Sequence, residues 1–554
     1  MRRWNGWGDD QFNLELPEQG LSFLAERLGP GSPLADSSLE HVCQQVPDSR
    51  LPAGDDVDAL MDTRPETRVR HARGQSLPDW LAMRSGEFGT FPDGVAFPES
   101  NQDVQALLQY AHRHQVVLIP YGGGTSVAGH INPVASERPV LTVDMSAMNR
   151  LIDLDEESRI ATFGAGTPGP LVEAQLRARG YTLGHFPQSF ELSTLGGWVA
   201  SRSSGQQSLR YGRIEQLFAG GRVETLKGTL QLPTIPASSA GPDIREMILG
   251  SEGRLGVITE VRVRVSALAE RESFHVVFFP DWNAARNACR TLVQNRVQLS
   301  MLRLSNAVET ETQLALAGHP RLIGLLEQVL SVRGARDGKC MMTFGVTGSR
   351  TQCASALKQA KQICGRLGGV YTGTRLGKKW AEKRFTMPYL REALWQLGYA
   401  VDTLETATDW DNVDNLLQRI EGNLRTGLSQ RENSRNERAH VFTHLSHVYG
   451  QGCSIYTTYV FRVADDYPET LARWRHLKTT TSELIVNNRG TISHQHGVGK
   501  DHAPWLPTEK GDLGILAIRA LCDTFDPDTL LNPGTLLDSG TLPNPGNSLD
   551  AEPS

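Results

Sequence analysis

The sequence lacks several features that would place it among membrane-spanning, exported or nucleic-acid-binding proteins. No apolar run reaches the roughly 18 residues that are needed to cross a bilayer. The first residues include two arginines but no apolar stretch behind them, so they predict no secretory or export signal, and we expect a cytoplasmic protein. A surplus of positive charge is also missing. The formal net charge of −6 argues against general nucleic-acid binding.

Cysteine is sparse and follows no pattern. Seven cysteines are scattered through 554 residues, and no C-x-x-C pair is present, which predicts free thiols rather than a disulfide framework. The remaining composition, with 39% hydrophobic and 21% charged residues, is that of a globular protein. The length exceeds what one core usually supports, so we expect two or three subdomains.

A glycine-rich loop follows the first strong strand pattern. Residues 116–119 are four β-formers that read as a buried strand ending at Pro120. Three consecutive glycines and two hydroxyl residues follow. Glycines let backbone N–H groups come close to a ligand and short hydroxyls add donors, so the loop suits a phosphate. It lacks the lysine of a Walker loop, and a simple turn between strands is the alternative.

A second glycine pattern, G-x-G-x-x-G at residues 164–169, lies between an expected strand and an expected helix. Such a pattern can mark a dinucleotide site. However, no second strand that ends in an acidic residue follows about 20 residues later. We therefore interpret the pattern as a tight turn.

Apolar spacing and capping residues predict the local structure on either side of this region. Ser100, followed by Asp103, predicts a capped helix with an apolar face. Further strands are expected at residues 140–145, 159–163, 275–279 and 300–304, and further helices at residues 170–180 and 282–294. An apolar stretch at residues 322–330 predicts a core helix, with a membrane-surface helix as the weaker alternative.

The segment at residues 453–461 alternates as a strand. Ser454, Tyr456 and Thr458 share one face. A hydroxyl-lined face with a central tyrosine suits a cavity wall, and the phenol could pass a proton if its pKa were lowered. An ordinary buried strand with a hydrogen-bonded tyrosine is the alternative.

Two histidines, His494 and His496, flank Gln495 in a glycine-rich segment. Histidines in such a place can transfer protons beside a ligand, or can simply be hydrogen-bonded in a loop. Together with His444 and His447 they could also hold a metal ion.

Two arginines, Arg303 and Arg391, are candidate ligands for an anion, because a guanidinium fork binds phosphate or carboxylate through two hydrogen bonds. For each arginine alone, a surface ion pair is the simpler interpretation.

The blocks of sequence at residues 120–126, 187–198, 201–205 and 250–258, in their order and spacing, resemble the FAD-binding domain of the vanillyl-alcohol oxidase and p-cresol methylhydroxylase superfamily. Within it, the chain is most similar to the alkyldihydroxyacetone-phosphate synthase family, from Trp4 to about Leu536. By this resemblance FAD is the cofactor, bound without a covalent link, although His130 and His185 lie near in sequence. The residues expected to bind FAD are Pro120, Tyr121, Gly122, Gly123, Gly124, Thr125, Ser126, Gln188, Ser189, Phe190, Glu191, Leu192, Ser193, Thr194, Ser201, Arg202, Ser203, Ser204, Glu252, Gly253, Arg254, Leu255, Gly256, Val257 and Ile258.

The resemblance also implies an α+β fold. We expect an N-terminal segment at residues 1–87, a two-subdomain FAD-binding domain of the p-cresol methylhydroxylase type at 88–267 and an α+β cap domain at 268–475. A C-terminal segment at 476–536 would complete the active site, and residues 537–554 would be a disordered tail.

The same resemblance assigns roles to the candidate catalytic residues. Tyr456 falls on the acid/base tyrosine of the family, Arg391 on the arginine at the substrate phosphate and Arg303 on a second substrate-binding arginine. His494 and His496 match the outer members of a three-histidine motif whose middle member is Gln495 here. An amide cannot shuttle a proton, so this replacement bears directly on the chemistry.

No metal is expected. Zinc-bearing flavin dehydrogenases of the superfamily carry a G-H-x-G-D-G-N-x-H pattern, and residues 446–454 lack its aspartate, asparagine and second histidine.

The implied reaction exchanges the acyl group of acyl-dihydroxyacetone phosphate for a long-chain fatty alcohol, through a bond to flavin N5, in ether-lipid synthesis. Its substrates are small and lipid-like, and the resemblance implies a homodimer with a loose membrane contact. One alternative is an FAD-dependent dehydrogenase or oxidase of a 2-hydroxy acid such as D-lactate or glycolate. Another is a flavin-fold protein that has lost catalysis and acts as a binding partner.

Overall fold

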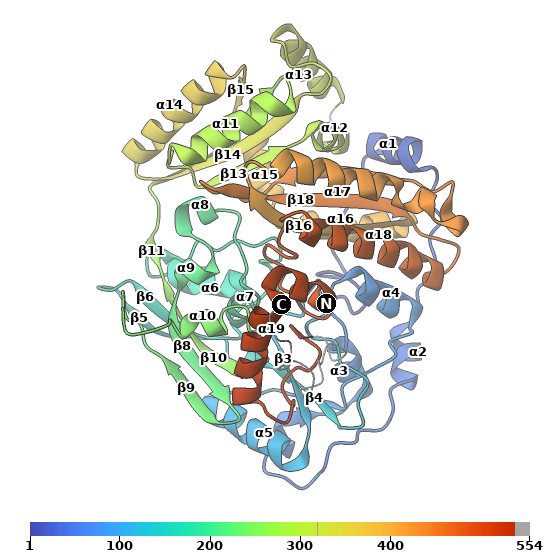
Figure 1. Cartoon of the computed structure of the whole chain (residues 1–554), viewed down its shortest axis with the longest axis vertical. Coiled ribbons are helices and arrows are strands. Elements are labelled where there is room, and N and C mark those ends of the chain that lie inside the picture. Colours follow the sequence, from blue (N-terminus) through green and yellow to red (C-terminus); the bar gives the residue numbers. More distant parts are fainter. Residues whose placement is uncertain (318–319, 538–554) are drawn as a thin grey trace, which may run out of the picture.

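Within residues 1–317 and 320–537, which the computed structural model describes, the strands form four sheets. Figure 1 shows the largest sheet in the upper half of the molecule, with strands β13, β14, β16 and β18, and the sheets that contain β3, β4, β8 and β10 in the lower half. The expected disordered tail lies outside the described residues, apart from Leu537.

The four-stranded sheet has the order β1-β2-β4-β3, with β4 parallel to both of its neighbours. Helix α5 (Asn101–His114) follows β2, and a reciprocal pair of hydrogen bonds between Ser100 and Asp103 caps it as predicted. Strand β3 continues through Pro120, further than expected, because it lies at the sheet edge, where a missing N–H is tolerated. The strands are β1 (Met61–Asp62), β2 (Gly94–Ala96), β3 (Val117–Tyr121) and β4 (Val140–Asp144).

The five-stranded sheet is antiparallel, with the order β5-β6-β10-β8-β9. The second glycine pattern begins at the end of β6, between two antiparallel neighbours, which excludes a parallel dinucleotide-binding unit and confirms the tight turn. The strands are β5 (Leu151–Asp155), β6 (Ile160–Gly164), β8 (Phe218–Thr225), β9 (Gly228–Leu232) and β10 (Val257–Arg264), with a separate pair of β7 (Tyr181–Thr182) and β11 (Ser266–Ala267).

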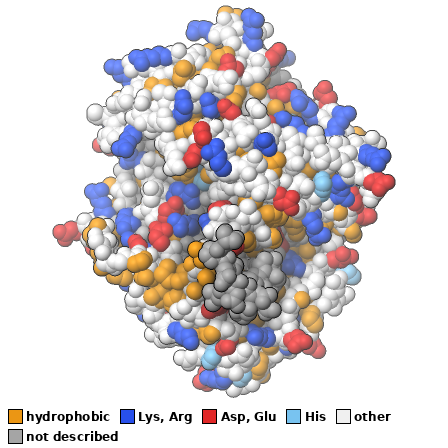
Figure 2. Space-filling view, in the orientation of Figure 1, with side chains coloured by type: hydrophobic (Ala, Val, Ile, Leu, Met, Phe, Trp, Pro, Cys, Tyr) orange, Lys and Arg blue, Asp and Glu red, His pale blue; other side chains and the backbone are white. Residues whose placement is uncertain are grey.

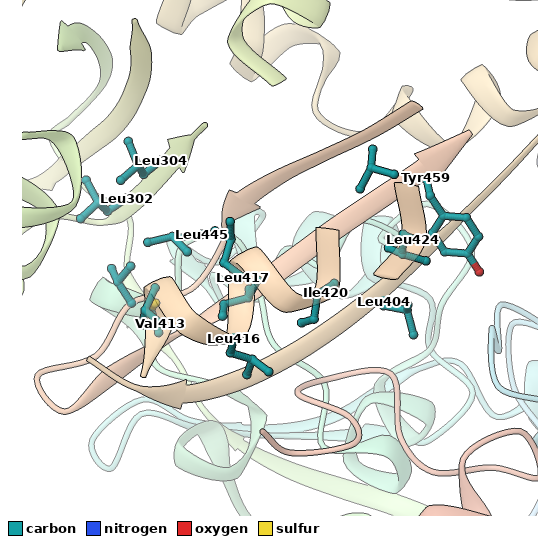
Figure 3. Close-up of a cluster of buried hydrophobic side chains, with 14 of the residues drawn as sticks. Leu302, Leu304, Leu404, Val413, Leu416, Leu417, Ile420, Leu424, Leu445 and Tyr459 are labelled. Atoms are coloured by element: carbon teal, nitrogen blue, oxygen red, sulfur yellow. The ribbon is translucent and has the colours of Figure 1, made fainter. Parts of the chain in front are cut away.

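The seven-stranded sheet is antiparallel, with the order β15-β12-β14-β13-β17-β18-β16. Helix α17 (Val413–Gly427) lays an apolar face on it: Leu416, Ile420 and Leu424 point toward β13, β16, β17 and β18 (Figure 3). The strands are β12 (Arg271–Phe279), β13 (Met301–Ser305), β14 (Cys340–Gly348), β15 (Val370–Gly373), β16 (Tyr399–Asp409), β17 (Ala439–Leu445) and β18 (Gly452–Arg462). The strands predicted at residues 275–279 and 300–304 are thus confirmed, as is the helix α11 (Trp282–Gln294).

Helix α13 (Pro320–Val332) corrects one prediction. The helix exists, but it is not a core helix: Leu325 is 60% exposed and Val332 87% exposed, while Leu330 is buried. Figure 1 shows α13 at one extremity of the molecule. Apolar composition alone could not tell a helix packed on both faces from one packed on a single side.

The remaining helices connect and cover these sheets. The helix predicted at residues 170–180 is present as α6, with a shorter C-terminal end. These helices are α1 (Glu18–Leu28), α2 (Leu39–Gln44), η1 (Asp58–Leu60), α3 (Pro65–Arg70), α4 (Leu77–Ser85), η2 (Met145–Ala147), α6 (Gly169–Arg177), α7 (Leu195–Ser201), α8 (Ser208–Tyr211), α9 (Ile214–Leu217), α10 (Arg245–Ile248), α12 (Ala307–Leu316), α14 (Arg350–Arg366), α15 (Arg375–Lys383), η3 (Met387–Tyr389), α16 (Leu390–Gln396), η4 (Leu428–Gln430), η5 (Glu432–Ser434), α18 (Tyr467–Asn487), η6 (Ala503–Trp505) and α19 (Leu506–Phe525).

The first and last described segments of the chain both reach the region of the glycine-rich loop. Arg2 Nη2 donates to the carbonyl of Gly123 at 2.6 Å. In the last described segment, the backbone N–H of Asn532 donates to the backbone carbonyl of Leu118 in β3 at 2.9 Å. The first and last described segments therefore help to build one site in the middle of the molecule.

The surface carries charges of both signs. Figure 2 shows lysine and arginine interspersed with aspartate and glutamate over the visible face, in keeping with the small net charge. No helix among the described residues is long and apolar enough to cross a membrane.

Candidate active site

A cavity of about 440 Å³ lies between the four- and five-stranded sheets on one side and the seven-stranded sheet on the other. Its walls bring together the glycine-rich loop after β3, the N-terminus of α7, strand β18 and the segment at residues 494–496. These parts are far apart in sequence, so the fold itself assembles the site that the separate motifs predicted.

Most of the predicted cofactor residues line this cavity. They are Pro120, Tyr121, Gly122, Gly123, Gly124, Thr125, Ser126, Gln188, Ser189, Ser193, Thr194, Ser201, Ser203, Glu252, Gly253, Gly256, Val257 and Ile258.

The other predicted cofactor residues do not line the cavity. Phe190 and Leu255 belong to a hydrophobic core, and Leu192 packs against another. Glu191 accepts a hydrogen bond from the Tyr389 hydroxyl at 3.0 Å. The rest make polar contacts of their own: Arg202 with Glu246, Ser204 with His447, and Arg254 with the carbonyl of Leu531.

The glycine-rich loop fits the role of a phosphate cradle. A Cβ on Gly123 would lie 1.9 Å from the Leu192 carbonyl oxygen, so only glycine lets the loop pack against residues 192–194. Gly124 has a φ of 64°, in the left-handed region. Thr125 and Ser126 line the same cavity, and their short hydroxyl side chains beside the loop suit the pyrophosphate of FAD.

The two histidines nearest to the cofactor motifs differ in position. His130 lines the cavity, with Nδ1 2.5 Å from Ser126 Oγ and Nε2 3.2 Å from Glu252 Oε1. His185 is buried behind the wall, 3.1 Å from Ser203 Oγ.

Tyr456 lies on the part of the cavity wall that strand β18 forms. The strand register places it opposite Glu405 on β16 and opposite His444 on β17. Its ring stacks on His444 with centroids 4.7 Å apart and meets the edge of His496 at 6.0 Å. Burial, reinforced by the charge of Glu405, raises the pKa of the phenol, so the lowered pKa considered from the sequence is not found.

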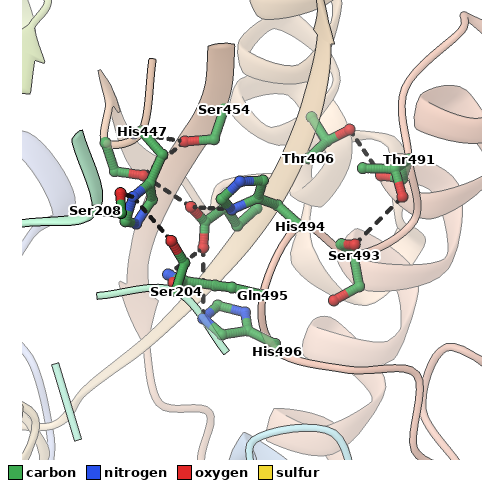
Figure 4. Close-up of polar contacts among 12 residues, drawn as sticks. Ser204, Ser208, Thr406, His447, Ser454, Thr491, Ser493, His494, Gln495 and His496 are labelled. Carbon is green, nitrogen blue, oxygen red and sulfur yellow. Dashed lines mark hydrogen bonds and ion pairs between the residues drawn. The ribbon is translucent and has the colours of Figure 1, made fainter. Parts of the chain in front are cut away.

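Glu405 organises the segment that carries the histidines. Its buried carboxylate accepts hydrogen bonds from Gln495 Nε2 at 2.6 Å and from Ser446 Oγ at 2.7 Å. It also lies 3.2 Å from His494 Nδ1 and 3.7 Å from His496 Nε2. Figure 4 shows His494, Gln495 and His496 converging on this point.

The three members of the predicted histidine segment are not equivalent. Gln495 and His496 line the cavity, whereas His494 is not among the lining residues and lies deeper, with Tyr449 and Arg213 at its Nε2. Burial lowers the pKa of His496, despite the opposing charge of Glu405, so its imidazole is neutral at neutral pH.

Glu405, His447 and His494 come close enough together to hold a metal ion. However, Arg213 Nη1 lies 3.0 Å from His494 Nε2, and a guanidinium can only donate. Nε2 is therefore the acceptor and Nδ1, which faces Glu405, carries the proton. This geometry favours a hydrogen-bonded cluster over a metal site.

The two predicted arginines also differ. Arg303 lines the cavity, but its Nη2 is bound to Glu309 at 2.5 Å and lies 3.2 Å from His444 Nδ1. Burial disfavours the Glu309 charge, yet His444 and Arg303 together lower its pKa to about 2. The charge of Arg303 is thus already balanced by protein.

Arg391 is less well satisfied. One nitrogen, Nη1, donates to the Gln75 carbonyl at 2.5 Å, and the guanidinium lies 4.5 Å above the Trp80 ring. Its Nε and Nη2 are buried and have no hydrogen-bond partner in the described part of the chain. An anion in the cavity would supply the missing acceptor.

Sequence reasoning missed several cavity residues. Trp80, Arg384, Asp402 and Thr403 line the wall, and Glu405 stands directly behind it. None of them belongs to a recognisable motif. Asn532, near the last described residues, also lines the cavity.

Comparisons with known proteins agree with this architecture. A family model described as an FAD binding domain matches residues 92–232, and one described as FAD linked oxidases, C-terminal domain, matches residues 268–536. A solved structure of p-cresol methylhydroxylase with substrate bound shares the fold, with a TM-score of 0.64 at 13% identity over 87% of this chain and 94% of that one. The predicted α+β fold and the predicted FAD cofactor are thus confirmed.

More specific similarity extends over nearly the full length. The alkyldihydroxyacetonephosphate synthase of Dictyostelium discoideum is 30% identical, covering 97% of this chain and 93% of its own. The enzyme of the same name from Trypanosoma brucei brucei is 30% identical over 85% of this chain and 77% of its own. A solved alkyldihydroxyacetonephosphate synthase structure superposes with a TM-score of 0.81 at 28% identity, covering 96% of this chain and 98% of that one. The chain therefore belongs to the alkyldihydroxyacetonephosphate synthase family.

Proposed function

We propose that this protein is an FAD-dependent transferase that exchanges the acyl group of acyl-dihydroxyacetone phosphate for a long-chain fatty alcohol. The observation that carries the proposal is the single cavity in which Tyr456, His496 and the unsatisfied guanidinium of Arg391 share walls with the FAD-binding motifs. The near full-length similarity to synthases of this name supports it.

The site has a place for each part of such a substrate. Arg391 would bind the phosphate, since its buried Nε and Nη2 lack an acceptor. The alkyl or acyl chain would lie along the apolar side chains of Leu390, Leu394, Val401 and Phe442, which line the same cavity. FAD, when bound by the cofactor motifs, supplies an electron sink for the exchange.

Proton transfer would involve Tyr456 and His496 together. The raised pKa of Tyr456 keeps its phenol protonated at neutral pH, and the lowered pKa of His496 keeps its imidazole ready to accept a proton. We propose that the phenol takes the proton of the substrate carbon while its own proton passes toward His496. Glu405 would hold this arrangement in place through Gln495 and His494.

The proposal includes assignments that rest on the family alone. We propose a homodimer in the cytoplasm that touches a membrane surface loosely, because both lipid substrates partition into membranes. We also keep the domain boundaries at residues 87, 267, 475 and 536 as proposals, and His494 as a residue that acts through Glu405 rather than on the substrate.

The test is a product assay on the purified holoprotein. With palmitoyl-dihydroxyacetone phosphate and deuterated hexadecanol, mass spectrometry should detect the deuterated ether of dihydroxyacetone phosphate. D-Lactate is the parallel substrate. Absence of the ether, together with oxidation of D-lactate, would reject the transferase and favour a 2-hydroxy-acid dehydrogenase.

A further inference from the structure

Another arginine of the cavity, Arg384, has guanidinium nitrogens without a hydrogen-bond partner. It lines the cavity next to the C-terminal end of α15, and neither its Nε nor its Nη1 has a hydrogen-bond partner among the residues that the structure describes. Its Nε and Nη1 are buried. Burial lowers the pKa of its guanidinium, and the charges of Glu272 and Glu173 oppose that shift only in part.

The surroundings of Arg384 are mainly aromatic. Its guanidinium lies 4.8 Å from the ring centroid of Phe186 and 4.7 Å from that of Phe385. The rings of Phe274 and Trp380 lie 5.9 and 6.0 Å away. Ring faces attract the cation, but they supply no hydrogen-bond acceptor for its N–H groups.

Arg384 and Arg391 share the cavity but lie in different settings. Arg391 stands over Trp80, on a wall that also carries the hydroxyls of Thr403 and Tyr456. Arg384 lies beside Trp380, and Met387, three residues further along the chain, lines the same cavity and is 48% exposed, so the cavity reaches the surface there. The first setting suits a strongly hydrated phosphate. The second suits an anionic group attached to an apolar chain.

The proposed exchange, on which this inference rests, handles two anions. The phosphate is present throughout. A carboxylate forms when the bond between the ester oxygen and the substrate carbon breaks and the oxygen keeps the electron pair. The alcohol oxygen then bonds to that carbon and loses its proton, so each ether formed is matched by one carboxylate and one proton.

We propose that Arg384 is a second anion-binding residue of the cavity, and that it receives the carboxylate of the released fatty acid. The guanidinium fork matches a carboxylate through two parallel hydrogen bonds. The aromatic and methionine side chains beside it would contact the first methylene groups of the chain. Arg384 thus separates the leaving anion from the phosphate at Arg391.

The experiment measures binding of palmitate to the holoprotein by titration calorimetry, without turnover. Hexadecanol, which has the same chain without charge, and dihydroxyacetone phosphate, which has the phosphate without a chain, are the comparison ligands. The variants are Arg384→Gln, Arg384→Lys and Arg391→Gln. Arg375→Gln is the matched control, since Arg375 lies exposed on the same helix, away from the cavity.

We expect R384Q to weaken palmitate binding at least tenfold. The affinities for hexadecanol and for dihydroxyacetone phosphate should change by less than twofold. R384K should recover part of the lost palmitate affinity. R391Q should weaken the binding of dihydroxyacetone phosphate only, and R375Q should leave the affinity for each of the three ligands unchanged. Palmitate affinity that is unchanged in R384Q, or a loss confined to dihydroxyacetone phosphate, would overturn the proposal. Flavin absorbance reports that each variant is folded and loaded.

The outcome is separable from that of the proposed function. If the protein makes the ether but its palmitate affinity does not depend on Arg384, this inference alone is overturned. Palmitate binding that depends on Arg384 in a protein that makes no ether would support the inference while rejecting the transferase.

Discussion

Gln495 donates a hydrogen bond of 2.6 Å to Glu405, whose carboxylate has no exposed surface. The same carboxylate lies beside His494 and His496, so one buried charge holds the whole segment. The amide that stands between the two histidines is therefore part of the site's framework, and in the proposed mechanism His496 and Tyr456 transfer the proton.

Replacing Glu405 with glutamine should change the pH dependence of the reaction. Glu405 raises the pKa of His496 against the lowering effect of burial. Without that charge the pKa of His496 should fall further, so the acid limb of the kcat/KM profile should move to lower pH. We also expect kcat to fall about tenfold or more, because one of the two oxygens that accept from Gln495 and Ser446 becomes an NH2 donor. An acid limb that stays in place would show that Glu405 does not act on His496.

Tyr456→Phe should abolish most of the activity and leave the fold intact. The ring and its stacking on His444 remain, but the proton carried by the phenol is gone. We expect kcat to fall about 100-fold or more with unchanged flavin content.

The control for Tyr456 is Tyr459→Phe, on the opposite face of the same strand. Tyr459 donates to Asp402 Oδ2 at 3.3 Å and does not line the cavity. Its loss should lower the free energy of unfolding by about 1 kcal/mol and spare kcat. Equal activities of the two variants would remove Tyr456 from the mechanism.

Gly123→Ala should disturb the cofactor loop. The new methyl group would meet the Leu192 carbonyl at 1.9 Å, and backbone cannot move aside without displacing the loop. We expect less than stoichiometric FAD and a loss of about 1–3 kcal/mol in unfolding free energy. In contrast, Gly365→Ala in helix α14 meets nothing within 4 Å and should gain about 0.5–1 kcal/mol. Full flavin occupancy in G123A would contradict the assignment of this loop.

We expect the protein to lose stability in mild acid because two of its histidines, His185 and His447, are buried. Burial lowers the pKa of His185 and that of His447 to about 3. Because the pKa of a histidine in the unfolded chain is 6.5, the contribution of each histidine to the free energy of unfolding is complete above pH 6.5. It declines as the pH falls toward 3. Each histidine contributes at most about 1.4 kcal/mol per pH unit. Thermal unfolding from pH 7 to 5 should show the decline, and His185→Gln should flatten it; an identical slope in that variant would be the contrary result.

The parts of the site that the sequence predicted are those whose signal is local. The glycine-rich loop and the alternating strand around Tyr456 are examples, because each pattern lies within a dozen residues. Glu405 could not be predicted, since it becomes the centre of the site only when β16 pairs with β18 in a register that sets it opposite Tyr456.

Charges and exposed surfaces were harder to predict than strands. Arg303 and Arg391 looked alike in sequence, but Glu309 neutralises only the first. Arg384 lines the cavity, but it belongs to no motif that the sequence shows. The apolar residues of α13 read as core, yet half of that helix has no layer of protein above it among the described residues.

The most direct measurement of the account follows the holoprotein without oxygen in the presence of palmitoyl-dihydroxyacetone phosphate and hexadecanol. Free palmitate, ether product and the flavin spectrum are recorded together. The account predicts one palmitate for each ether formed, with oxidised flavin at the end and no external electron acceptor. The account would be contradicted if the substrate released no palmitate and D-lactate reduced the flavin instead.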